Sequence, residues 1–166
     1  EGIAKLSKCS YERMVAHFFL AQVYLRARFN DLNSAQTLEL DWDEESGTGF
    51  ITAPTLDSKT QRSAAKKTTF LPMTGQTPGV TSFNWGLSFI DERRAQGVEK
   101  FRWKMPTPDR HGGWLDIPMD VTTAGKWLRS LLSSGGHADL TLVGTHSLKC
   151  TCLSWASKHG SIDITD

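Results

Sequence analysis

Apolar residues recur at helical spacing near both ends of this chain, and the part between the two stripes lacks that period. The first stripe runs through residues 10–26, where Ser10 is suited to cap a helix with apolar positions at Met14, Phe18, Ala21 and Leu25. The second covers residues 121–134, with Asp120 as cap, Gly135-Gly136 as end and apolar positions at Ala124, Trp127, Leu128, Leu131 and Leu132. A mainly helical core is therefore expected.

The segment between the stripes favours extended chain followed by one more helix. We expect extended pieces at residues 38–42, 50–52, 55–60 and 68–73, with a turn at 44–49, before Pro72 and Pro78 break the pattern. Residues 82–96 predict a helix with Phe83, Leu87 and Ile90 on one side. Residues 97–113 are rich in proline and glycine and are predicted to be a long loop or insertion. The expected fold class is α+β, mainly helical with a small antiparallel sheet.

Composition is typical of one intracellular domain, residues 1–166. The 166 residues are 39% hydrophobic and 10% aromatic, which is enough to bury a core. The longest apolar run, around residues 18–25, is interrupted by Gln22 and is too short to cross a bilayer, and three cysteines make no disulfide framework. The net charge of +1 argues against a strongly basic nucleic-acid protein, but acids gather at residues 39–45, so a local basic patch could still bind DNA. No cofactor is predicted.

The sequence Thr145-His146-Ser147-Leu148-Lys149 holds the most informative functional signal. If Thr145 caps a helix that begins at His146, a proton-transfer group and a fixed cation share one face of its first turn, where backbone N–H groups favour an anion. This is the outline of a phosphate site. The alternative is a solvated helix face, since a histidine and a lysine at this spacing are common. A metal site built on Cys150 and Cys152 is disfavoured because their spacing matches no zinc pattern.

Two further basic segments precede this one along the chain. Arg28-Phe29-Asn30-Asp31-Leu32 follows the first helix, and Arg28 is either a phosphate-binding side chain or a surface arginine paired with Asp31. Ser58-Lys59-Thr60 lies in the expected hairpin, with Lys66 and Lys67 as rivals to Lys59. The three lysines could equally form a solvated basic hairpin.

In this order, the three segments resemble the catalytic domain of the tyrosine recombinases and phage-type integrases. Arg28 with Asp31 and Leu32 looks like the family's first arginine box, Lys59 looks like its hairpin lysine, and His146 matches the histidine of its His-x-x-Arg box. Lys149 departs from that pattern, since it stands where the second arginine is expected. The residues from 146 to 156 are similar to recombinase domains of eukaryotic mobile elements. The resemblance covers nearly the whole chain, although its motifs are short.

The resemblance implies strand breakage and rejoining on duplex DNA, performed by copies of the protein assembled on the DNA. A tyrosine attacks a phosphodiester, and extra negative charge develops on the non-bridging oxygens. Arg28 and Lys149 would stabilise that charge, Lys59 would protonate the leaving oxygen, and His146 would act as a base or a hydrogen-bond donor. A eukaryotic origin would imply a nuclear location. We also expect Arg28, His146 and Lys149 to converge on one concave, positively charged face.

The nucleophile does not fit this pattern. The only tyrosines are Tyr11 and Tyr24, both ahead of Arg28, and the family's later His/Trp box and tyrosine lie beyond its second box. We therefore expect a catalytic-type domain that is incomplete at its C-terminus and inactive by itself. The alternative is a DNA-binding or structural relic that kept the fold and lost the reaction.

Overall fold

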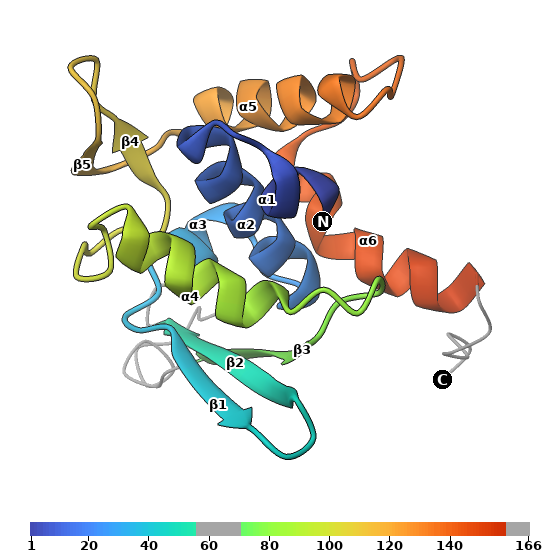
Figure 1. The fold of residues 1–166 in the computed structure, drawn as a ribbon. Coiled ribbons are helices and arrows are strands. Elements are labelled where there is room, and N and C mark those ends of the chain that lie inside the picture. Colours follow the sequence, from blue (N-terminus) through green and yellow to red (C-terminus); the bar gives the residue numbers. More distant parts are fainter. Residues whose placement is uncertain (56–70, 159–166) are drawn as a thin grey trace, which may run out of the picture.

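The computed structural model describes residues 1–55 and 71–158 and contains helices around one central helix, a three-stranded sheet and a separate hairpin (Figure 1). In chain order the elements are α1 (Gly2–Leu6), α2 (Ser10–Tyr24), α3 (Phe29–Asn33), β1 (Glu39–Asp43), β2 (Thr48–Thr55), β3 (Leu71–Thr77), α4 (Trp85–Ala95), β4 (Pro106–Pro108), β5 (Trp114–Pro118), α5 (Val121–Ser134) and α6 (Thr145–Lys158). The expected α+β class, mainly helical with a small antiparallel sheet, is confirmed. None of the helices within these ranges is long and apolar enough to cross a bilayer.

Helix α2 is central because it contacts α1, α4, α5, α6 and β3. Its predicted stripe is confirmed, since Met14, Phe18, Ala21 and Leu25 are all buried. The ring of Phe18 meets those of Phe29 and Phe89 edge-on at centroid distances of 5.4 and 6.5 Å, which joins α2 to α3 and α4. The predicted cap is one residue off, because Ser10 is the first helical residue and Cys9 precedes it as the N-cap.

The sheet has the antiparallel order β1-β2-β3, and Figure 1 shows it at one end of the helices. The predicted strand at 38–42 corresponds to β1, and the turn predicted at 44–49 falls between β1 and β2. Pro72 was expected to break the returning strand, but it lies inside β3 opposite Pro54. Strand β3 is at the edge of the sheet, where a missing N–H is tolerated. Gly75 lets β3 approach α2 closely, because an added Cβ would lie 2.8 Å from the Tyr24 carbonyl oxygen.

Helix α4 differs from the prediction in its start and in its buried face. It begins at Trp85, and Ser82 ahead of it has a positive φ of 59°, which is incompatible with a right-handed helix there. The buried side chains are Trp85, Phe89 and Arg93. Of the predicted stripe, Phe83 lies ahead of the helix, and Phe83, Leu87 and Ile90 are only partly buried, with Phe83 and Ile90 packed against the edge of the core. Apolar spacing alone did not reveal that an arginine occupies the inner face.

The segment predicted to be a loop, residues 97–113, contains part of a hairpin. Strand β4 pairs antiparallel with β5, and the turn between them includes Gly112 and Gly113, both with positive φ. Residues 97–105 connect α4 to this hairpin without a helix or strand.

Helix α5 matches its prediction closely. Its bounds are Val121–Ser134, the side chain of Asp120 accepts a hydrogen bond from the Thr123 N–H at 2.9 Å, and Gly135 forms the C-cap. Ala124, Leu128 and Leu131 are buried, and Trp127 and Leu132 pack against the core from its edge. Sequence periodicity was sufficient here because one face is purely apolar.

Candidate functional site

Arg28 is the N-cap residue of α3, at the point where the chain leaves α2. Its side chain is 32% exposed, and one terminal nitrogen lies 4.0 Å from the carboxylate of Asp31, whose side chain is 11% exposed. Within residues 1–55 and 71–158, the Arg28 guanidinium makes no hydrogen bond, so its N–H groups are available to a ligand. Two interpretations of Arg28 came from the sequence. The pairing with Asp31 is present as a long ion pair, and the phosphate-binding role stays a prediction.

His146 and Lys149 lie in the first turn of α6. The helix begins at Thr145, so the prediction that Thr145 caps a helix beginning at His146 is wrong by one residue. His146 is exposed and Lys149 is half-buried. Because they are three residues apart on a helix, their side chains leave the same side of it. A first helical turn also favours an anion beside it, although the N–H of Ser147 in this turn already donates to the Gly144 carbonyl oxygen at 3.0 Å.

Gln22 joins the Arg28 region to the His146 region. Its side-chain amide donates a 2.5 Å hydrogen bond to the carbonyl oxygen of Thr145, directly before His146. The backbone carbonyl oxygen of Gln22 accepts the N–H of Ala27, directly before Arg28, at 3.0 Å. Both Gln22 and Thr145 are buried. The two basic segments are therefore attached to the same residue of α2.

Sequence reasoning noticed Gln22 only as an interruption of the apolar run at residues 18–25. The signal was that interruption itself, because a buried polar side chain in an apolar stripe needs a partner. The partner is the carbonyl of Thr145, far away in sequence. The amide oxygen of Gln22 has no partner among the residues that the structure describes, so this joint is only half satisfied.

The convergence of Arg28, His146 and Lys149 stays a prediction. The structure links their segments through Gln22 and through the contact between α2 and α6, but the described residues show no hydrogen bond or ion pair directly between Arg28 and the α6 pair. The predicted hairpin lysines Lys59, Lys66 and Lys67 lie outside the described residues. The side chain of Cys152, on which the rejected metal site depended, is not described either.

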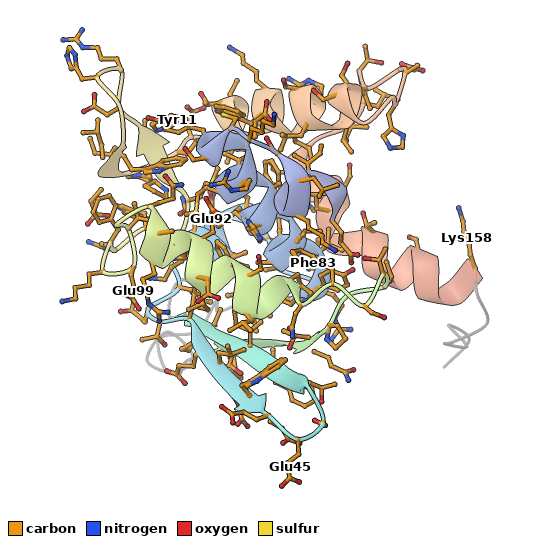
Figure 2. The ribbon with its side chains drawn as sticks, in the orientation of Figure 1. Tyr11, Glu45, Phe83, Glu92, Glu99 and Lys158 are labelled. Atoms are coloured by element: carbon orange, nitrogen blue, oxygen red, sulfur yellow. The ribbon has the colours of Figure 1, made fainter. Side chains whose placement is uncertain are left out.

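Both tyrosines take part in other interactions. The Tyr11 hydroxyl accepts a hydrogen bond from the Gly113 N–H at 2.6 Å, and its ring lies 5.0 Å from that of Trp114; Figure 2 shows Tyr11 beside the β4–β5 hairpin. The Tyr24 hydroxyl contacts Glu1 and accepts from the Val80 N–H, and its ring stacks on Trp85. Both hydroxyls therefore take part in hydrogen bonds away from α6, and the exclusion of both tyrosines as the nucleophile stays a prediction.

His17 is a second histidine with a defined environment, and sequence reasoning did not single it out. It is buried, and its ring nitrogens lie 2.8 Å from the Arg13 carbonyl oxygen and 2.8 Å from the Ser88 hydroxyl. Burial lowers the pKa of His17, with the Arg13 carbonyl acting in the opposite direction. Because both nitrogens are used inside the core, His17 joins α2 to α4 and does not offer a second site.

The comparisons with known proteins bear on the fold. No protein-family model matches the chain, and no curated protein sequence matches it. Among solved structures, the chain is similar to a chain of "FLP Recombinase-Holliday Junction Complex I", with a TM-score of 0.53 and 15% sequence identity. The match covers 93% of this chain and 37% of the other. The chain thus has a tyrosine-recombinase-like fold and spans well under half the length of that neighbour.

Proposed function

We propose that this chain is part of a DNA breaking-rejoining domain of the tyrosine-recombinase type, and that Arg28, His146 and Lys149 bind a phosphate of duplex DNA. The observation that carries the proposal is the Gln22 joint, which attaches the arginine segment and the α6 segment to one buried residue of a recombinase-like fold. The order of the motifs along the chain supports the same assignment.

Each residue has a physical reason for its role. Arg28 carries a planar, permanent charge with several N–H donors, a geometry that suits two phosphate oxygens at once. His146 is exposed at the start of α6, where it can donate a hydrogen bond to a phosphate or accept a proton from a nucleophile. Lys149 keeps the positive charge expected at its position and lacks the two-pronged geometry of arginine.

The same proposal holds that these 166 residues bind DNA without cutting it. Covalent catalysis of this type needs a tyrosine hydroxyl at the phosphate, and the tyrosines at 11 and 24 are engaged elsewhere. A DNA-binding relic would behave identically, so the proposal covers both. Assembly of several copies on DNA, a mobile-element origin and a nuclear location follow from the resemblance and belong to this proposal as well.

Binding is tested by titrating salt against a fluorescent duplex. If about three phosphates are neutralised, the affinity should fall about 40-fold between 50 and 200 mM salt, because bound counterions are released. Arg28→Ala with Lys149→Ala removes the cations from that one phosphate and should lower the slope of log K against log salt by about 0.9. Arg94→Ala with Lys126→Ala removes the same charges from exposed positions on α4 and α5, and should leave binding nearly unchanged.

Cleavage is tested with a nicked suicide duplex and a search for a covalent protein–DNA band. We expect no band from the wild-type chain or from Tyr11→Phe and Tyr24→Phe. A covalent band that disappears in either tyrosine variant would overturn the assignment of the tyrosines. Binding that ignores both salt and the double substitution at Arg28 and Lys149 would overturn the phosphate site.

A further inference from the structure

A cavity of about 400 Å³ lies between the chain ahead of β1, the second half of α4 and the segment that follows α4. Its lining combines an apolar wall with charged and polar side chains: Leu38, Ile90 and Phe101 on the one hand, and Gln36, Thr37, Arg93, Glu99, Lys100 and Lys104 on the other. Figure 2 labels Glu99, in the loop after α4. Arg28, His146 and Lys149 are not among the residues that line this cavity.

Arg93 is 2% exposed and holds the 97–105 segment against α4. Its terminal nitrogens donate to the carbonyl oxygens of Lys104 at 2.7 Å and Val98 at 2.6 Å. A guanidinium has five N–H groups, so this leaves donors for a further partner. Burial lowers the pKa of Arg93 to about 10, which still leaves it charged at neutral pH.

Lys104 is a second buried cation in the same cavity, at 5% exposure. Its ammonium donates to the carbonyl oxygens of Gln36 and Arg102, each at 3.2 Å. An ammonium has three N–H groups, so one is left for a further acceptor. Burial first, and then the charge of Arg93, lower the pKa of Lys104 to about 8.

No carboxylate of the described residues lies within ion-pair distance of either cation. Glu99 reaches the cavity; its carboxylate lies 3.4 Å from Arg94, and its negative charge also acts on Arg93 from a longer distance. The carboxylate of Asp116 acts on both cations from a longer distance and accepts the backbone N–H groups of Arg102 and Trp103. Two like charges are therefore buried together, a costly arrangement that an anion would relieve.

We propose that the cavity of Arg93 and Lys104 binds a small molecule that carries an oxyanion, a phosphate or a carboxylate, on an apolar body. The free N–H groups of the two cations would hold the oxygens, and the apolar body would lie against Leu38, Ile90 and Phe101. The volume of about 400 Å³ is within the range of small-ligand sites and exceeds that of a bare phosphate ion. This site is independent of the function proposed above.

The test uses phenyl phosphate as the probe, with phenol as its neutral counterpart and ionic strength held constant. The pKa of Lys104 is followed in the wild-type chain through the NMR signal of its ¹³C-labelled Cε. Phenyl phosphate should raise that pKa, because an anion favours the charged ammonium, and phenol should leave it unchanged. A Lys104 signal that ignores phenyl phosphate, or that responds only to duplex DNA, would overturn the proposal.

A thermal shift provides the second arm. At a phenyl phosphate concentration about tenfold above its Kd, the wild-type Tm should rise by about 3–5 °C. Lys104→Met should lose this shift, and Lys126→Met, which removes an exposed lysine on α5, should keep it. An equal shift in Lys104→Met would overturn the proposal. If Lys104→Met does not fold, the NMR measurement on the wild type decides.

Discussion

The helices packed around α2 and the 97–105 segment are held in place by different combinations of forces. The helices meet through apolar side chains such as Phe18 and Leu128, which are fully or almost fully buried. The 97–105 segment buries Val98 and Met105 as well, and it is fastened in addition by hydrogen bonds from Arg93 and Lys104 to carbonyl oxygens. Apolar packing tolerates small shifts, whereas each of these bonds needs a defined geometry.

The comparison shows that the two parts of the chain contribute differently to the free energy of unfolding. The apolar region gains free energy from burial, so its loss should be large and spread over several elements. The polar segment pays for the burial of two charges and regains part of that in hydrogen bonds, so its net contribution should be smaller. The following predictions test this ranking.

The largest effect is expected from Phe18→Ala. The ring contacts Phe19, Phe29 and Phe89, so its removal leaves a cavity between α2, α3 and α4. The free energy of unfolding should fall by about 3–5 kcal/mol, measured by urea denaturation. Leu142→Ala is the control, because Leu142 is 96% exposed, and it should change stability by less than about 0.5 kcal/mol. Similar losses for both would contradict the apolar-core assignment.

The second effect compares neighbouring arginines of α4. Arg93→Met leaves the carbonyls of Val98 and Lys104 without their donor but also removes a buried charge, so we expect a loss of about 1–3 kcal/mol. Arg94→Met breaks only exposed ion pairs with Asp91 and Glu99 and should cost less than about 1 kcal/mol. Hydrogen exchange should show the 97–105 segment opening in Arg93→Met alone. Equal exchange in both variants would mean that Arg93 does not fasten the segment.

The same contrast explains which parts of the fold could be predicted from the sequence. Residues 10–26 and 121–134 were recognised because burial on one face leaves an apolar period in the sequence. The inner face of α4 was missed because Arg93 occupies it, and a buried arginine has no apolar signature. Strand β4 and the turn after it were taken for a loop because their prolines and glycines resemble turn residues.

The sequence singled out candidate residues, and their role as a site stays a prediction. The spacing of His146 and Lys149 and the place of Arg28 after the first helix were visible in the sequence. The connection between them was not, because it is a single long-range hydrogen bond from Gln22 to a backbone carbonyl, and any residue type has a carbonyl. Only the polar interruption of the apolar run indicated that Gln22 had a partner.

The last effect concerns the pH dependence of stability that Lys104 imposes. The pKa of Lys104 is lowered to about 8 in the folded chain, against 10.5 as its ordinary value. Between these two pH values the ammonium is mostly deprotonated in the folded chain and still protonated in the unfolded chain. The free energy of unfolding should therefore rise with pH across that interval, and the stability that the buried charge removes below it should return. Denaturant unfolding of the wild type and of Lys104→Met from pH 7 to about pH 10.5 measures this difference. The free energy of unfolding of the wild type should increase relative to that of Lys104→Met as the pH rises. A difference that stays constant would show that Lys104 keeps its ordinary pKa, and with it that the 97–105 segment does not bury a cation.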